Sequence, residues 1–157
     1  MTRIALDTNI LVYSEGLARS ASDGPKIDLS RRLLRGLLLA GERPGLPVPC
    51  LSELHNVLVR KGRLSAPEAS ERAAKLRAVA DVYPVTPDDL DAALELSAHH
   101  GLQIFDAVIL AVAVEGNCDL LVSEDLQDGF AWRGLLVSNP FGANPDPRLA
   151  RLLSSES

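Results

Sequence analysis

Short apolar runs alternate along this chain with longer segments in which apolar residues recur every three or four positions. The short runs have the length of strands and cover residues 3–6, 82–85, 119–123 and 135–138. A further run, 45–50, carries Val48 between two prolines and predicts a short edge strand centred on that residue. The longer segments predict helices at residues 9–19, 26–40, 51–61, 65–81, 86–101 and 105–115.

Strands that are separated by helices pair in parallel through right-handed crossovers. The pattern therefore predicts an α/β fold, a three-layer α/β/α sandwich around a parallel sheet of four or five strands. We expect one domain over residues 1–141, followed by a Pro-rich tail, 142–157, with room for one short helix. Thr8 or Asn9 is placed to cap the helix that follows the first strand.

Composition narrows the classes of function. Hydrophobic residues make up 46% of the chain and aromatic residues only 4%, so the core must be aliphatic. The formal net charge of -5 excludes a protein that binds nucleic acid through its overall charge. Cys50 and Cys118 lie in apolar stretches without a CxxC spacing, which predicts two buried thiols in a reducing compartment. Without a secretory signal or an apolar run of about 20 residues, we expect a cytoplasmic protein that does not cross a membrane.

Four acidic residues lie where the chain should meet one edge of the predicted sheet. Asp7 ends the first strand, and Asp125 follows the fourth strand along the chain. Asp106 begins the last of the predicted helices, and Glu53 lies in the first turn of the third. Ligands of open parallel sheets bind beyond the carboxyl ends of the strands. We therefore expect these four acids to converge there.

Each of these acids, taken alone, has an ordinary structural explanation. Asp7 could cap a helix, Asp106 and Glu53 could each favour the dipole of a helix start, and the loop that holds Asp125 could simply be solvated. As a cluster, however, the acids would repel one another, because two carboxylates about 4 Å apart repel by about 4 kcal/mol at an effective dielectric near 20. Such a cluster must take up protons or bind a cation. Oxygen ligands favour Mg²⁺ or Mn²⁺, and an ion of this kind can activate water to hydrolyse a nucleic-acid backbone.

Five segments carry a resemblance to a known family. They are residues 6–13 (LDTNILVY), 52–58 (SELHNVL), 105–107 (FDA), 121–129 (LVSEDLQDG) and 137–141 (VSNPF). In this order and at these intervals they resemble the motifs of the PIN-domain nucleases, which include the VapC toxins of toxin–antitoxin pairs. The similarity spans about residues 3–141, nearly the whole chain.

This resemblance implies a metal-dependent endoribonuclease that leaves a 3′-hydroxyl and a 5′-phosphate. It implies that Asp7 and Asp106 are the principal Mg²⁺ ligands, that Glu53 and Asp125 complete the pocket directly or through water, and that two polar residues orient the acids. These supporting residues would be Asn9 and Ser123. A VapC-like chain would also form a homodimer and bind a VapB-like antitoxin. Glu124, beside Asp125, adds charge that leaves open which of the two acids reaches the metal.

Basic side chains offer routes to RNA in spite of the acidic net charge. They gather in three groups: Arg31, Arg32 and Arg35; Arg60, Lys61 and Arg63; and Arg72, Lys75 and Arg77. Arg60 lies seven residues after Glu53, about two helical turns on, and is our candidate for a phosphate contact. A solvated helix face explains any one of these groups equally well. None of the three histidines is assigned a role, since His55 does not complete an HExxH site and His99 and His100 suit a helix end.

Other acidic-pocket folds fit the sequence less well. A phosphatase with an aspartyl nucleophile would want a second Asp two residues after the first, where Asn9 stands. A phospho-receiver domain would want a lysine on a late strand, and the last lysine is Lys75. Two alternatives stay open: a catalytically silent PIN fold that binds nucleic acid or protein, and a housekeeping RNA-processing nuclease rather than a toxin.

Overall fold

The computed structural model of the chain describes residues 2–154 and contains a six-stranded sheet. The strands are β1 (Ile4–Leu6), β2 (Gly45–Pro47), β3 (Asp81–Tyr83), β4 (Leu120–Val122), β5 (Ala131–Trp132) and β6 (Leu135–Ser138). Their order across the sheet is β3-β2-β1-β4-β6-β5, and all neighbours are parallel except β5 and β6. The parallel sheet predicted from the sequence is confirmed, with one short antiparallel strand added at its edge.

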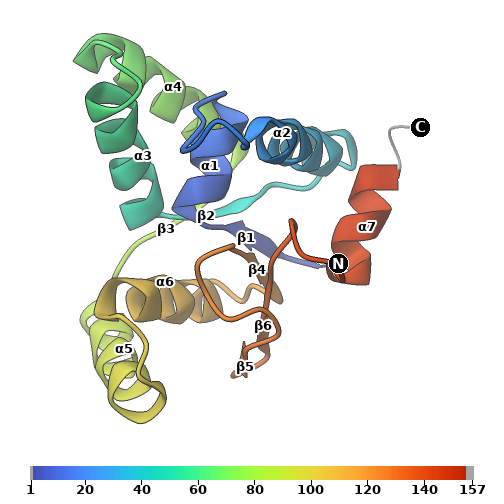
Figure 1. Cartoon of the computed structure of the whole chain (residues 1–157). Helices are drawn as coiled ribbons and strands as arrows, with labels where there is room; N and C mark the ends of the chain where they lie inside the picture. Colours follow the sequence, from blue (N-terminus) through green and yellow to red (C-terminus); the bar gives the residue numbers. More distant parts are fainter. Residues whose placement is uncertain (1, 155–157) are drawn as a thin grey trace.

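Helices cover both faces of this sheet, as the sandwich prediction requires. They are α1 (Thr8–Ser14), α2 (Gly24–Leu39), α3 (Val48–Arg60), α4 (Ala66–Val79), α5 (Pro87–His100), α6 (Ile104–Glu115) and α7 (Pro147–Ser154). Figure 1 shows α1 to α4 on one side of the strands and α5 with α6 on the other. Helix α7 lies within the predicted tail and packs against α2; residues 155–157 of that tail lie outside the described residues.

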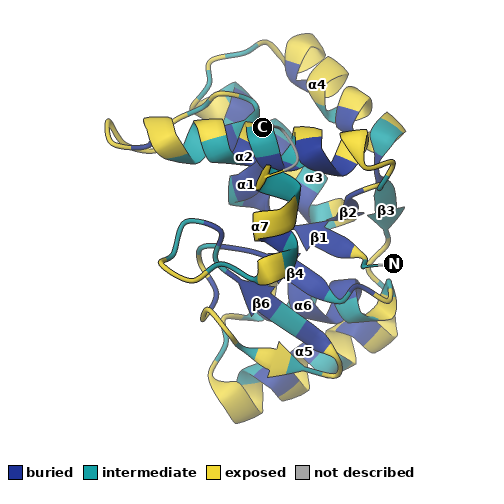
Figure 2. Cartoon of the chain, turned by 90° about the vertical axis from the view of Figure 1, so that its right-hand side faces the viewer, coloured by how far each residue is buried: buried dark blue, intermediate teal, exposed yellow. Residues whose placement is uncertain are grey.

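The core is aliphatic, in agreement with the composition. All three residues of β1 are buried, and α6 buries five consecutive residues from Ile109 to Ala113 between the sheet and α5. Dark blue in Figure 2 follows β1, β4 and most of β6 and the inward sides of the helices, while the edge strand β3 is only partly buried and the outer sides of α4 and α5 are exposed. Both Cys50 and Cys118 are buried and unpaired, as predicted. No helix within residues 2–154 is long and apolar enough to cross a bilayer.

Three element boundaries differ from the sequence prediction. Val48 begins α3 instead of forming a strand, because the strand ends at Pro47 and a proline at position 49 suits the first turn of a helix. Helix α1 ends at Ser14, not near residue 19, since Gly16 adopts the left-handed backbone (φ 87°) that terminates helices. Strand β5 was not predicted; it is two residues long and pairs with β6 across the tight turn at Arg133 and Gly134, both of which have positive φ.

The strand order creates a crevice beside the central strand. From β1 the chain proceeds to β2 and β3 on one side, then returns to β4 and β6 on the other. The connections after β1 and β4 therefore leave the sheet in opposite directions at neighbouring strand ends, which is where open α/β sheets bind ligands. Leu6 is paired with Val122, so the residues that follow, Asp7 and Ser123, emerge side by side.

Candidate active site

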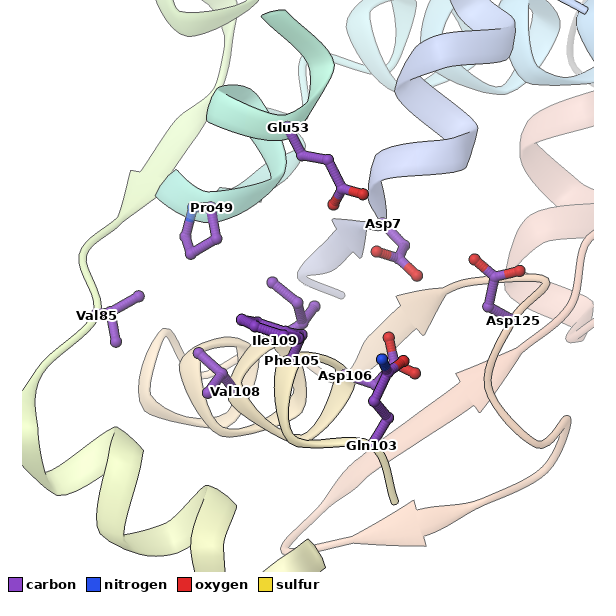
Figure 3. A pocket seen from close by; sticks show the side chains of 10 residues that line it. All are labelled: Asp7, Pro49, Glu53, Val85, Gln103, Phe105, Asp106, Val108, Ile109 and Asp125. Atoms are coloured by element: carbon purple, nitrogen blue, oxygen red, sulfur yellow. The ribbon is translucent and has the colours of Figure 1, made fainter. Parts of the chain in front are cut away.

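Four acids from four separate segments line one pocket of about 940 Å³ at this crevice: Asp7, Glu53, Asp106 and Asp125. The first follows β1, the second lies on α3, the third in the first turn of α6, and the last in the loop after β4. In Figure 3 their carboxyl groups point toward a common space between α3 and α6. The structure thus brings together all four acids that the sequence singled out.

Asp7 is the most enclosed of the four, with only 7% of its surface exposed. It is the N-cap of α1, in place of the Thr8 or Asn9 that we expected, and its Oδ1 accepts the backbone N–H of Thr8 at 2.7 Å. The Ser123 hydroxyl donates to its Oδ2 at 2.7 Å. Burial, reinforced by the charges of Asp125 and Asp106, nevertheless raises the pKa of Asp7 to about 6. Its environment therefore favours either a proton or a neighbouring cation.

Thr8 joins two of the acids and was missed as a site residue. Its backbone N–H binds Asp7, while its buried hydroxyl donates to Oε2 of Glu53 at 2.9 Å. The signal was present in the sequence, because Thr8 directly follows a candidate ligand at the start of a helix. That position predicts only a capping residue, because which helix-start hydroxyl reaches another segment depends on the packing of α1 against α3.

Asp106 and Asp125 are two further acids that line the pocket. Burial raises the pKa of Asp106, and the charges of Asp125 and Glu53 raise it further. Burial also raises the pKa of Asp125, although the nearby Arg19 opposes this shift. Asn9 donates to Oδ2 of Asp125 at 2.6 Å, and the backbone N–H of Asp125 donates to the Ser123 hydroxyl at 3.2 Å. Asn9 thus donates to Asp125 and Ser123 to Asp7, while their role as supporting residues stays a prediction.

Glu124 points away from the pocket. Its side chain is 11% exposed and accepts the Tyr13 hydroxyl at 2.5 Å and the Lys26 ammonium at 2.8 Å. Asn9 also approaches it, at 3.4 Å. Of the two adjacent acids after β4, it is therefore Asp125 that lines the pocket, while Glu124 anchors the same loop to α1 and α2.

Arg60 does not line the pocket. It is the last residue of α3, whereas the pocket residues Pro49 and Glu53 lie near the first turn of that helix. Seven residues correspond to about 10 Å along a helix axis. Arg60 is exposed, so a contact with a phosphate away from the acids stays a prediction that the structure does not test.

The opposite half of the pocket is apolar, a feature that sequence reasoning did not anticipate. It is lined by Pro49, Val85, Phe105, Val108 and Ile109, with Gln103 at the rim. Figure 3 shows these apolar side chains on the left, facing Asp7, Asp106 and Asp125 on the right. They come from α3, α6 and the connection between β3 and α5, so no single segment of the sequence reveals the surface they share.

The donor set fits a hard, partly hydrated cation. All four groups offer carboxylate oxygens, and three of them carry raised pKa values that a cation would lower again. Within residues 2–154, no three acidic, histidine or cysteine side chains lie close enough together to hold one ion between them. The preference for Mg²⁺ or Mn²⁺ rests on the donors alone, because carboxylate oxygens are hard ligands and Mg²⁺ keeps several waters beside one or two carboxylates.

The fold matches several solved structures. A toxin–antitoxin complex from Klebsiella pneumoniae gives a TM-score of 0.63 at 16% identity, over 89% of this chain and 98% of that one. VapC20 of Mycobacterium tuberculosis, described as a toxin that cleaves the sarcin–ricin loop, gives 0.53 at 23% identity, over 75% and 86% of the two chains. VapBC2 from Rickettsia felis, solved with a DNA fragment from its promoter, gives 0.55 at 20% identity, over 78% and 87%. At such identities the similarity establishes a shared fold.

Family membership follows from the sequence match. Among curated proteins no sequence matches this chain at a significant level. The family model of the PIN domain, however, matches residues 4–130, which contain all four acids, Thr8, Asn9 and Ser123. The resemblance seen in the sequence is thereby confirmed, and the chain belongs to the PIN domain family of nucleases.

Proposed function

We propose that this protein is a Mg²⁺- or Mn²⁺-dependent endoribonuclease that hydrolyses RNA phosphodiester bonds. The observation that carries the proposal is the convergence of Asp7, Glu53, Asp106 and Asp125 on one pocket at the switch point of a PIN fold. A cluster of four acids around one buried carboxyl group, that of Asp7, is costly to maintain without a cation. A phosphodiester hydrolase has a use for it, because a bound divalent ion activates water and neutralises charge on the phosphate.

Each acid has a part that follows from its surroundings. Asp7 and Asp106 would hold the ion from the two sides of the crevice, because they are the least exposed of the four. Glu53, held by Thr8, and Asp125, held by Asn9, are more exposed and would bind directly or through water. Ser123 keeps Asp7 oriented through its hydroxyl while its oxygen accepts the backbone N–H of Asp125.

RNA cleavage by purified protein tests this function. We expect wild type to cleave total cellular RNA in the presence of Mg²⁺ or Mn²⁺ and to stop in EDTA. Asp7→Asn and Asp106→Asn should each lower the rate at least about 100-fold, because both remove a ligand charge. Asp28→Asn, a matched change at an exposed position of α2, should cleave at the wild-type rate. Cleavage that persists in EDTA, or in both pocket variants, would refute the proposal.

We also propose that the nuclease is the toxin of a type II toxin–antitoxin pair, that it forms a homodimer, and that it acts in the cytoplasm. The support is the fold shared with a toxin–antitoxin complex, VapC20 and VapBC2. Expression should then arrest growth, and co-expression of a VapB-like protein encoded beside it should relieve the arrest. Full growth of cells that express active nuclease would instead support a housekeeping RNA-processing role, and an inactive pocket in wild type would support a silent binding module.

A further inference from the structure

Phe105 is the most exposed large hydrophobic side chain of the described chain, with 74% of its surface accessible. It lies in the first turn of α6, directly before Asp106, and is the only aromatic ring among the ten residues that line the acidic pocket. The structure describes no other protein group that covers it. A single exposed apolar side chain is ordinary, but Phe105 continues the apolar lining of the pocket, and a contiguous apolar surface beside a candidate metal ligand is typical of a binding site.

The pocket around Phe105 has two chemically different halves. The acidic half suits a cation and the phosphate that it would bind, and the other half offers Phe105 with Pro49, Val85 and Val108. Figure 3 shows these two groups facing one another across the same space. A nucleotide is divided in the same way, into an anionic phosphate and a flat, largely apolar base. A volume of about 940 Å³ accommodates such a unit with its neighbours in the strand.

Building on the proposed nuclease function, we infer that Phe105 is a stacking platform for an unpaired base of the RNA next to the scissile phosphate. Aromatic rings recognise single-stranded nucleic acid by stacking on its bases, and this contact tolerates different bases because each has a π-face. Gln103, exposed at the rim, carries an amide that can donate to and accept from a base edge. Since the chain is acidic overall, such stacking supplies affinity that its net charge does not.

A cleavage-inactive background separates RNA binding from the reaction. In Asp7→Asn protein, we would measure by fluorescence anisotropy the binding of a labelled single-stranded oligo(A) 12-mer and of the same strand with abasic sites. Adding Phe105→Ala should weaken binding of the intact strand about 5- to 100-fold and leave the abasic strand unchanged. Phe105→Trp should restore binding, because it keeps a flat ring. Leu39→Ala, which removes a 72% exposed side chain at the end of α2, should have no effect.

A tryptophan at this position also reports on the contact itself. In a Phe105→Trp, Trp132→Phe variant the indole is the single tryptophan of the chain, so quenching of its fluorescence by the intact strand marks stacking. The inference fails if intact and abasic strands bind Asp7→Asn protein equally, or if Phe105→Ala binds as tightly as its parent. It also fails if Phe105→Ala weakens binding only by dissociating a dimer in analytical ultracentrifugation, since the ring would then contact a second copy of the chain.

Cleavage assays distinguish this failure from failure of the proposed function. If wild type cleaves RNA in a metal-dependent way while Phe105→Ala has an unchanged KM, the nuclease function stands and the stacking role is wrong. If wild type does not cleave RNA at all, the proposed function itself is wrong. A raised KM with a nearly unchanged kcat in Phe105→Ala supports both.

Discussion

At Asp7 the fold encloses a carboxyl group whose charged form is disfavoured by burial and by two neighbouring acids. Its pKa is raised from 3.8 to about 6 on folding. Between these values the unfolded chain releases the proton more readily than the folded one, so the free energy of unfolding falls as the pH rises through this window. The loss of stability caused by the charged Asp7 carboxylate is then complete above pH 6 and absent below pH 3.8.

Asp7→Asn should therefore stabilise the metal-free protein at neutral pH. We expect a gain of up to about 3 kcal/mol at pH 8 in EDTA, since each pKa unit corresponds to about 1.4 kcal/mol, and little gain at pH 4. Urea unfolding at the two pH values measures it, with Asp28→Asn as the exposed control. A variant that is less stable than wild type by the same amount at both pH values would show that the bonds from Ser123 and Thr8 outweigh the charge.

Lys26 neutralises the acid that turns away from the pocket. It lies 2.8 Å from Glu124, and this hydrogen bond raises the pKa of Lys26. Lys26→Met leaves Glu124 with only the more distant Arg19, at 3.7 Å, and should lower the free energy of unfolding by about 1–3 kcal/mol. Lys26→Arg should restore most of the loss. Lys75→Met, which breaks a surface pair with Glu71 at 3.4 Å, should change stability by less than about 1 kcal/mol in the same urea titrations. Equal effects of the two Met variants would contradict the anchoring role.

The place of a side chain in the site could be predicted from the sequence where the position of the residue along the chain determines it. Asp7 and Asp125 follow parallel strands, and the ends of such strands must share one edge, so their convergence could be predicted. Thr8 and Glu124 differ, because their roles depend on which side chain of another segment each one meets. Sequence position alone does not determine that contact.

At the scale of elements, the hydrophobic period located helices α1 to α6 and, with shifted ends, strands β1, β3, β4 and β6. It failed where local backbone chemistry outweighed periodicity. Val48 has the side chain of a strand residue but lies between two prolines that suit a helix start, and it begins α3. Strand β5 has only two residues, too few to show a hydrophobic period. It is recognised only from the turn that follows it, where Arg133 and Gly134 have a left-handed backbone.

Helix α7 should contribute to the stability of the domain although it lies beyond the matched family region. Leu149 is fully buried in the common core. The backbone of α7 also packs closely on α2, because a Cβ added at Gly36 would lie 2.8 Å from the carbonyl oxygen of Leu152. Leu149→Ala should cost about 2–5 kcal/mol in urea unfolding. The exposed Leu39→Ala should cost less than about 0.5 kcal/mol. An equally small effect at Leu149 would show that α7 is dispensable and that the domain ends near residue 141.

Across the whole molecule, the pocket joins parts that the chain order keeps apart. Asp7 follows the central strand, Glu53 lies in the helical layer on one face, and Asp106 in the layer on the other. The sequence could predict this acidic convergence from topology. It could not predict the apolar half, because Pro49, Val85 and Phe105 share a surface only after three segments have packed.

A divalent ion bound by these acids would therefore stabilise the entire fold and not one loop. Ligand that binds only the folded state at 100 times its Kd adds about 2.7 kcal/mol. In a chain of this size that corresponds to a rise of about 5–10 °C in Tm. We expect saturating Mn²⁺ to produce such a rise in wild type and in Asp28→Asn, and EDTA to reverse it.

In Asp7→Asn and Asp106→Asn the rise should be mostly lost, although both variants fold. An equal rise in all four proteins would place the ion elsewhere, and protection from hydrogen exchange confined to the loop after β4 would show that the acids of the two helical layers do not share it.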